Sequence, residues 1–201
     1  MATIYDIKPK FQAMLRPLVV KLHEWNVTPN GVTVSAALLS ILFGVLLYIQ
    51  LHSVLLLLLP AFLLLRMMMN AIDGMLAKEH DKQTRLGMFL NELGDMVSDA
   101  ALYLPLALWI DAPVELIIGI VVIALVGEAA GILAIAVGSK RRYDGPFGKS
   151  DRAFFFSVLA LALYFFTFHS NAYLILLIFA FILSVATVVN RLRAALREGD
   201  S

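Results

Sequence analysis

Long apolar stretches, separated by shorter polar ones, set the pattern of this chain. A helix that crosses a bilayer needs roughly 20 apolar residues, and six of the stretches are long enough. They predict membrane spans at residues 32–52, 54–79, 86–110, 114–139, 150–168 and 171–190. The connections near 52, 111 and 169 are very short, whereas those at 80–85 and 140–149 are longer and polar. We therefore expect an all-α integral membrane protein with six transmembrane helices.

The residues before the first span follow a different pattern, in which apolar side chains recur at the spacing of a helix. These residues are Phe11, Met14, Leu15, Leu18, Val19, Leu22 and Trp25. The basic residues among them are Lys8, Lys10, Arg16 and Lys21. This pattern is typical of an amphipathic helix that lies in the membrane surface with its apolar face down, and Pro17 would bend it. A frayed basic tail is the alternative interpretation.

Basic residues are unevenly distributed between the connections. Of the 16 lysines and arginines, only Arg66 lies outside the N-terminal segment, the two polar loops with their flanks, and the C-terminal end. Because Lys and Arg gather on the cytoplasmic side of membrane proteins, we expect both termini and both polar loops in the cytoplasm. The expected organisation is one membrane domain over 1–201, divided into an interfacial helix at 1–27, a six-helix bundle at 28–193 and a cytoplasmic tail at 194–201.

Composition supports a lipid environment. Hydrophobic residues make up 61% of the chain and the mean hydropathy is +0.86, whereas soluble domains contain about 45–50% apolar residues. The chain has no cysteine, which excludes disulfides, and its formal charge of +1 says little about partners. We expect membrane lipids as neighbours and no nucleic-acid partner.

Amides and carboxylates interrupt the second and third spans near the polar loop that joins them. Asn70 lies 10 residues before position 80 and Asp95 lies 10 after position 85, and the corresponding distances for Asp73 and Asn91 are 7 and 6. In a helical hairpin, equal distances from the loop mean similar depth, so these side chains should face each other in two layers. Their oxygens suit Mg²⁺ or Mn²⁺ rather than zinc, which would call for His or Cys.

A second group of charged residues lies one turn deeper. Arg66, Asp99 and Glu128 fall at similar levels in three different spans. An unpaired charge inside a membrane is costly, so we expect Asp99, Glu128 or both to neutralise Arg66 in a structural ion cluster. The alternative gives Glu128 a role in holding an acceptor substrate.

The polar stretch of the second and third spans resembles the signature of the CDP-alcohol phosphotransferase family, D-x2-D-G-x2-A-R-x8-G-x3-D-x3-D. At the same spacing this chain has Asn70, Asp73, Gly74, Ala77, Lys78, Gly87, Asn91 and Asp95. Every interval matches, and five of the eight specified residues agree. TPNGVT at 28–33 is similar to the start of the family's first span, and GPFGKSDR at 145–152 is similar to a basic loop of some members.

The resemblance implies six spans and an enzyme that transfers a phosphatidyl (substituted phosphate) group from a CDP-linked lipid, usually CDP-diacylglycerol, to an acceptor hydroxyl with release of CMP. It implies a cytoplasm-facing site in the bacterial inner membrane, and a homodimer. Two divalent ions, Mg²⁺ or Mn²⁺, would be held by Asn70, Asp73, Asn91 and Asp95, and Asp95 would also be the catalytic base. The nucleotide would be bound by Thr28, Pro29, Asn30, Asp73, Gly74, Ala77, Lys78 and Gly87.

Three departures from the signature bear on activity. Asn70 and Asn91 replace aspartates, which removes two negative charges from the expected metal site and should weaken metal binding. Lys78 replaces an arginine and loses its bidentate grip on phosphate. The hypothesis of a working enzyme therefore has an alternative, a catalytically weak or silent relative that binds CDP-lipid or a partner enzyme. A transporter is disfavoured because the polar residues gather at one end of the spans.

The acceptor site is less well defined. Lys149 and Arg152 follow a Gly-Pro-x-Gly turn and begin the fifth span, where a helix N-terminus favours anions. Together with Glu128 they are the candidates for contact with the acceptor alcohol. The sequence leaves the identity of that alcohol open.

Overall fold

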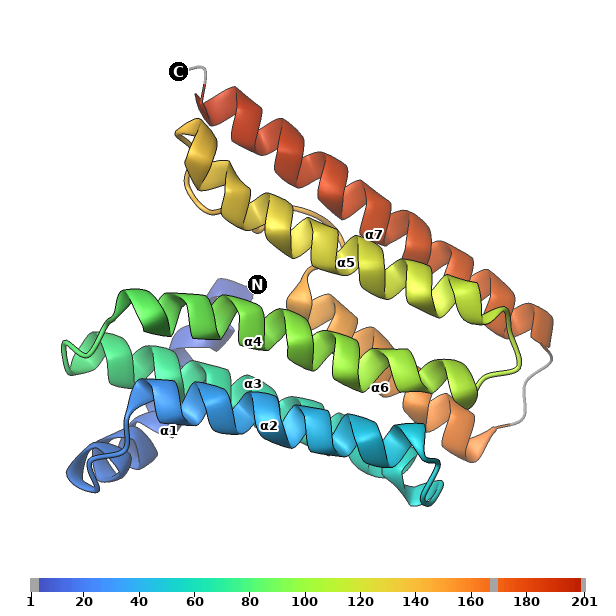
Figure 1. Cartoon of the computed structure of the whole chain (residues 1–201), viewed down its shortest axis with the longest axis horizontal. Helices are drawn as coiled ribbons and strands as arrows, with labels where there is room; N and C mark the ends of the chain where they lie inside the picture. Colours follow the sequence, from blue (N-terminus) through green and yellow to red (C-terminus); the bar gives the residue numbers. More distant parts are fainter. Residues whose placement is uncertain (1–3, 167–169, 200–201) are drawn as a thin grey trace. The chain divides into compact units, whose positions relative to one another are not determined.

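The computed structural model describes residues 4–166 and 170–199, with side chains for residues 11–166 and 171–198. In this part of the chain every regular element is a helix (Figure 1). Seven are α-helical: α1 (Ile4–Glu24), α2 (Pro29–Tyr48), α3 (Val54–Glu79), α4 (Arg85–Tyr103), α5 (Val114–Leu133), α6 (Lys149–Phe165) and α7 (Ser170–Gly199). Two short 3₁₀ helices, η1 (Leu104–Leu108) and η2 (Ala134–Val137), extend α4 and α5. The all-α prediction is confirmed.

Four helical segments are long and apolar enough to cross a membrane: Pro29–Tyr48, Val54–Glu79, Val114–Val137 and Asn171–Glu198. α4 falls short because its 19 residues include Arg85, Glu92, Asp95 and Asp99. α6 falls short because it has only 17 residues and begins with Lys149, Asp151 and Arg152. Length and composition thus support an integral membrane protein, and the count of six spans stays a prediction.

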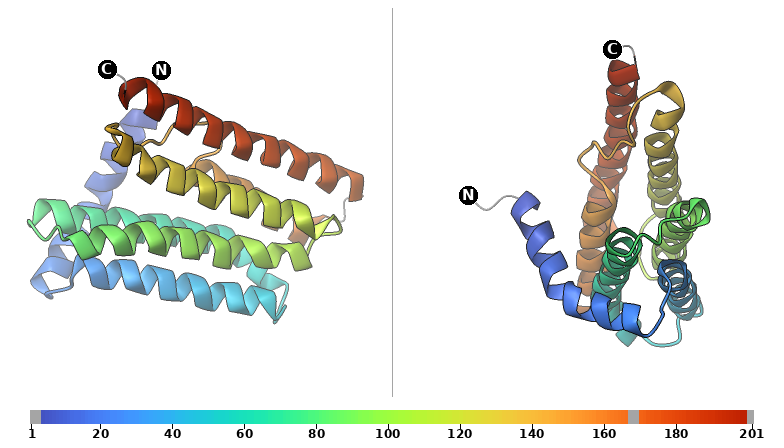
Figure 2. Two further views of the ribbon diagram at one scale, coloured as in Figure 1. Left: turned by 45° about the horizontal axis from the view of Figure 1, so that its top comes forward. Right: turned by 90° about the vertical axis from the view of Figure 1, so that its left-hand side faces the viewer.

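The chain divides into two compact units. The first unit contains Met1–Leu42 and Ala61–Ser98, and the second contains Phe43–Pro60 and Asp99–Ser201. Helices α2, α3 and α4 each contribute a segment to both units. In the first unit these three helices run side by side (Figures 1 and 2).

The N-terminal helix α1 packs on the first unit through part of its apolar surface. Leu15 and Val19 are buried in one core cluster with Val32 of α2 and with Ile72 and Leu76 of α3. Met14, Leu18 and Trp25 are exposed instead. The helix itself was predicted, but not this division of its apolar residues, because the spacing does not tell which of them face protein. Lys8 and Lys10, which belong to the predicted basic face, have side chains outside the described residues.

Polar contacts fasten α1 to the turn between α3 and α4. Arg16 forms a salt bridge with Glu79 at 2.9 Å. The rings of His23 and His80 stack with centroids 3.6 Å apart, and Lys82 Nζ lies 3.2 Å from His23 Nδ1. These contacts place α1 next to the polar end of the α3–α4 hairpin. α1 changes direction along its length (Figure 2), as expected of a helix with proline in its interior.

In the second unit α5 and α7 run side by side (Figures 1 and 2). The ring of Tyr103, at the end of α4, stacks on Phe156 of α6 with centroids 4.0 Å apart. Trp109 Nε1 donates to the carbonyl oxygen of Leu47 at 2.9 Å, which ties the end of α2 to the chain after η1.

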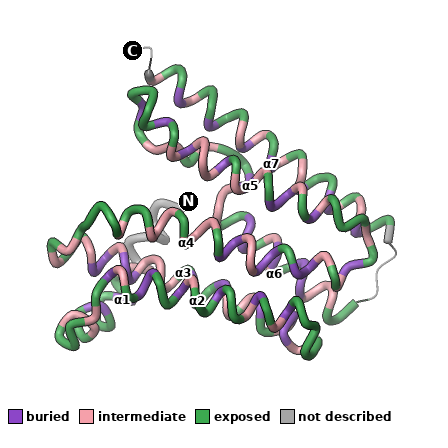
Figure 3. Tube along the Cα trace, viewed as in Figure 1, coloured by how far each residue is buried: buried purple, intermediate pink, exposed green. Residues whose placement is uncertain are grey.

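Many large apolar side chains remain exposed along the helices (Figure 3). Leu38 of α2 is 61% exposed and Ile175 of α7 is 69% exposed. Soluble proteins rarely leave such extensive apolar surface to water, so these faces fit contact with lipid chains.

The close approach of α2 and α4 at Gly44 gives a stability test. A Cβ on Gly44 would overlap the carbonyl oxygen of Ala101, whereas a Cβ on Gly74 of α3 would meet nothing within 4 Å. Overpacking of this kind costs about 1–3 kcal/mol. We expect Gly44→Ala to lower the apparent melting temperature of the purified protein by roughly 3–10 °C.

The matched control is Gly74→Ala, which adds the same methyl group in open space and should not lower the melting temperature. A Gly44→Ala protein as stable as the wild type would contradict the observed packing of α2 on α4.

Candidate functional site

The hairpin of α3 and α4 brings together residues from opposite ends of the polar stretch. α3 ends at Glu79 and α4 begins at Arg85, so the turn lies where the sequence predicted it. Thr84 caps α4 because its Oγ1 accepts the backbone N–H of Gly87 at 2.9 Å. Asp81 takes the positive φ of 52° that reverses the chain. A short, well-capped turn fixes the register of the two helices.

Asn70 of α3 and Asp95 of α4 are in direct contact. The Nδ2 of Asn70 donates to the Oδ1 of Asp95 at 2.7 Å, which confirms the predicted depth of this pair. Arg66, one turn away on α3, lies 3.3 Å from the same Oδ1 and donates to the backbone oxygen of Asp95 at 2.9 Å. Its side chain is 4% exposed. Asp95 is therefore held by an amide and a guanidinium at once.

Asp73 is held from a third helix. The hydroxyl of Thr33 on α2 donates to its Oδ2 at 2.7 Å, and both residues are buried. Sequence reasoning missed Thr33, although it lies in the TPNGVT segment. Its contact with Asp73 depends on which face of α2 packs against α3, and the sequence of an apolar span gives little indication of that face.

Asn91 completes the group, which we call the cradle: Asn70, Asp73, Asn91 and Asp95. Asn91 is half-buried on α4. Its predicted pairing in depth with Asp73 stays a prediction. The cradle supplies two carboxylates and two amide oxygens, a donor set that suits a hard divalent cation.

The described residues contain no group of three or more His, Cys, Asp and Glu side chains that could hold a metal ion. The reason is visible in the cradle, where two of the four positions are asparagines. Its donor atoms fit a divalent cation, but its negative charge is small for a metal site.

The beginning of α2 lies next to the beginning of α4. Thr28 caps α2, since its Oγ1 accepts the N–H of Gly31 at 3.1 Å, and Pro29 is the first helical residue. A Cβ on Gly87 would lie only 2.6 Å from Oδ1 of Asn30, so glycine allows this approach. Two sequence-predicted nucleotide contacts, Asn30 and Gly87, are thus neighbours in the fold.

The other predicted nucleotide contacts lie on α3. Gly74 has open space where a side chain would be, and Lys78 is exposed on the last turn. Ala77, which lies between them in the sequence, is half-buried. Open backbone at Gly74 would let a ligand approach the helix closely.

Asp99 and Glu128 both contact Arg152 of α6. Their predicted neutralisation of Arg66 stays a prediction. Arg152 Nη2 lies 2.9 Å from Oδ2 of Asp99 and 2.9 Å from Oε1 of Glu128. The Arg152 side chain is 2% exposed. The residue predicted to contact an acceptor is therefore a buried member of an ion cluster.

Two further arginines approach Glu128. Arg191 of α7 lies 3.3 Å from Oε2, and Arg141 lies 3.9 Å from the same oxygen. Arg191 also donates to the carbonyl oxygen of Gly127 at 2.6 Å. Sequence reasoning assigned Arg191 no role, although a basic residue at the end of an apolar span is a recognisable signal.

The loop between η2 and α6 is anchored beside this cluster. The N–H of Arg142 donates to the carbonyl oxygen of Gly131 at 3.0 Å, and the N–H of Phe147 donates to Oγ1 of Thr187 at 2.9 Å. Hydrogen bonds from Arg142 hold the pKa of the Asp144 carboxyl below its usual value. The first turn of α6 is closed by Asp151, which accepts the N–H of Gly148 at 2.9 Å. Lys149 thus begins α6 on a fixed loop.

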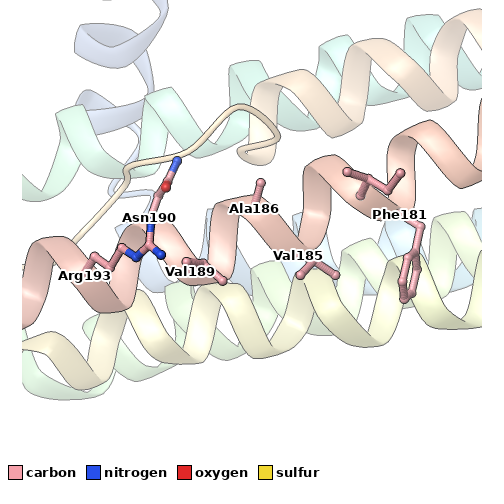
Figure 4. Close-up of a pocket in the computed structure, with 7 residues that line it drawn as sticks. Phe181, Val185, Ala186, Val189, Asn190 and Arg193 are labelled. Atoms are coloured by element: carbon pink, nitrogen blue, oxygen red, sulfur yellow. The ribbon is translucent and has the colours of Figure 1, made fainter.

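A shallow hollow of about 450 Å³ runs along α7 (Figure 4). Its lining comes from α7 alone, with apolar residues from Phe181 to Val189 followed by Asn190 and Arg193. An apolar face that ends in a basic side chain fits contact with lipid. It contains none of the residues predicted for the functional site.

Comparison with known proteins decides the family. The family model for CDP-alcohol phosphatidyltransferase matches residues 26–189, which include the cradle and most of the buried ion cluster. The chain belongs to the CDP-alcohol phosphatidyltransferase family.

Two protein relatives share sequence with this phosphatidyltransferase family member. It is 43% identical to the inner membrane protein YnbA of Escherichia coli over 194 residues, covering 96% of each chain. It is 35% identical over 96 residues to an uncharacterised protein of Aquifex aeolicus, covering 47% of this chain and 46% of the other.

Solved structures share the fold. The phosphatidylinositol phosphate synthase PgsA1 of Mycobacterium tuberculosis, in complex with manganese and citrate, superimposes with a TM-score of 0.75 at 21% identity, covering 90% of this chain and 88% of that one. The same synthase with CDP-DAG bound gives a TM-score of 0.74 at 21% identity, with 89% and 92% coverage. The helical fold described above is therefore the fold of this synthase.

The buried ion cluster of the second unit gives a second stability test. Arg152→Met would leave Asp99 and Glu128 buried without their shared guanidinium, and breaking a buried pair in this way costs about 3–5 kcal/mol. We expect a clear fall in the apparent melting temperature in detergent, and partial recovery when Glu128→Gln is added.

Arg193→Met is the matched control, because Arg193 is exposed on α7; it should melt like the wild type. If Arg152→Met had the stability of that control, the cluster would contribute nothing to folding.

Proposed function

We propose that this protein transfers a phosphatidyl group from a CDP-linked lipid, CDP-diacylglycerol, to an acceptor hydroxyl and releases CMP, as a step in phospholipid synthesis. The observation that carries the proposal is the contact of Asn70 with Asp95 at 2.7 Å. It brings the first and last signature positions together, although they lie 25 residues apart. Family membership supplies the reaction class, and the bound CDP-DAG of the PgsA1 structure supports the donor.

The cradle would hold the cation, Mg²⁺ or Mn²⁺. A pyrophosphate resists attack because its oxygens are negative, and a divalent cation there would neutralise that charge. The manganese in the PgsA1 structure supports such an ion. Asp73 and Asp95 would provide its charged ligands, and Asn70 and Asn91 its neutral ones.

Asp95 is the residue that we assign as general base. As a carboxylate it accepts hydrogen bonds from Asn70 and Arg66, which orient it on α4. A carboxylate in a fixed position can take the proton of an incoming hydroxyl. The acceptor oxygen would then attack the phosphorus that bears the diacylglycerol, and CMP would leave.

The nucleotide would lie along the beginning of α2 and the end of α3. Thr28, Pro29 and Asn30 would line one side, with Gly87 beside Asn30. Asp73, Gly74, Ala77 and Lys78 would line the other, where the open space at Gly74 supports close approach of the ligand.

The acceptor would be bound by Lys149, Arg152 and Glu128. Lys149 and Arg152 lie in the first turn of α6, and a helix N-terminus favours anionic groups. Arg152 already contacts two carboxylates. We propose that Lys149, the first residue of α6, also reaches the acceptor.

In the membrane, we propose six spans, with α4 and α6 added to the four apolar segments, and the exposed side of α1 in the inner leaflet interface. Both termini and the cradle would face the cytoplasm. The inner-membrane relative from Escherichia coli supports that location. We expect a homodimer.

Release of CMP from CDP-diacylglycerol by the purified protein, with Mg²⁺ or Mn²⁺ and a panel of acceptor alcohols, tests the proposal. Removal of the cation with a chelator should abolish release. Asp73→Asn and Asp95→Asn should each lower the rate by about 100-fold or more, because the first removes a charged ligand and the second also removes the base.

Asp111→Asn serves as the matched control, since Asp111 is exposed before α5 and outside both clusters; its rate should equal that of the wild type. If no acceptor gives CMP while CDP-diacylglycerol binds normally, the protein is instead a silent relative that binds the CDP-lipid.

A further inference from the structure

The hollow along α7 has the length of a lipid chain in one leaflet. Its volume is about 450 Å³, and its apolar lining runs from Phe181 to Val189 (Figure 4). A helical stretch of this length rises about 13 Å, at 1.5 Å per residue. That is close to half of a hydrocarbon core roughly 30 Å thick, so an acyl chain of a single leaflet can lie along the whole hollow.

Polar side chains follow directly on the apolar part. Asn190 and Arg193 complete the lining, and both are exposed. Because the side chains of a helix tilt towards its N-terminus, Arg193 extends back towards Val189 (Figure 4). Arg197 is exposed four residues further on, which places it one turn away on the same face. Two guanidinium groups therefore lie where the headgroup of a lipid in the hollow would be.

Arg193 is placed differently from the buried arginines of the same unit. Arg152 and Arg191 contact carboxylates inside the protein, so their charge is balanced within the fold. Arg193 instead lines a hollow on the surface of α7. From there its guanidinium can donate two parallel hydrogen bonds to a phosphate group.

We infer that the hollow binds one anionic phospholipid of the bilayer per chain, with an acyl chain along residues 181–189 and the phosphate on Arg193 and Arg197. A headgroup with net negative charge complements two guanidinium groups, whereas the ammonium of a zwitterionic headgroup would oppose them. Each basic side chain near a membrane surface favours anionic lipid by about fivefold. The inference concerns the lipid-facing surface of α7 and does not rest on the proposed function.

Site-specific quenching tests the inference. The chain has no cysteine, so a single introduced cysteine is its only thiol for labelling. Ile178→Cys, labelled with bimane, places a fluorophore at an exposed position of α7 one turn before Ile182. The full-length protein is reconstituted in phosphatidylcholine vesicles that contain either brominated phosphatidylglycerol or brominated phosphatidylcholine. We expect the brominated phosphatidylglycerol to reach half-maximal quenching at a mole fraction about fivefold lower.

The matched label is Leu42→Cys on α2, which is also exposed and lies a similar distance along its helix from the polar end. There the two brominated lipids should quench alike. Equal quenching by both lipids at Ile178 would overturn the inference. So would the absence of quenching by either lipid at Ile178, because a protein surface would then cover the hollow.

Removal of charge tests the two arginines. In the labelled Ile178→Cys protein, Arg193→Gln combined with Arg197→Gln should make the two lipids quench alike. The matched control combines Arg85→Gln with Lys140→Gln, which removes the same charge from exposed residues outside the hollow, and it should keep the preference. A folded Arg193 and Arg197 variant that keeps the preference would overturn the inference. If that variant does not fold, the comparison of the labels at Ile178 and Leu42 decides.

Discussion

The hydrogen bond between Asn70 and Asp95 is the constraint on which the rest of the site depends. At 2.7 Å it sets the register of α3 against α4, and that register decides which side chains share a level near the turn. Arg66 reinforces it from one turn away by contacting both the side chain and the backbone of Asp95. Thr33 connects α2 to α3 by donating a hydrogen bond to Asp73. Three helices are thereby fixed by polar contacts at the same place, which is how a site for small polar ligands can be built among apolar spans.

In both units buried carboxylates are paired with arginines, and each arginine is shared between two acceptors. In the first unit Arg66 contacts both the side-chain carboxylate and the backbone carbonyl oxygen of Asp95. In the second unit Arg152 contacts the carboxylates of Asp99 and Glu128. Arg191 contacts Glu128 and the carbonyl oxygen of Gly127. The planar guanidinium has several donors in fixed directions, so one side chain can satisfy more than one acceptor. Lysine could not replace it in these positions without leaving acceptors unsatisfied.

Sequence spacing predicted the features that depend on neighbours along one hairpin. The turn at 80–85 and the facing of Asn70 and Asp95 both follow from counting residues in helices, and the structure confirms them. It did not predict the contacts that depend on how helices rotate about their axes. Thr33 on Asp73, Arg152 on Asp99 and the division of α1 into buried and exposed apolar residues belong to this class, because an apolar span presents nearly the same chemistry on every face.

The proposed chemistry requires the cation to bind at the cradle. The most direct measurement is a crystal of the protein soaked with Mn²⁺ and CDP, with data collected at the manganese absorption edge. We predict an anomalous peak within direct coordination distance of the Asp73 carboxylate, on the side of α3 that faces α4. A peak elsewhere in the chain with none at the cradle, or carboxylates of Asp73 and Asp95 that point away from each other around an ordered nucleotide, would contradict the account.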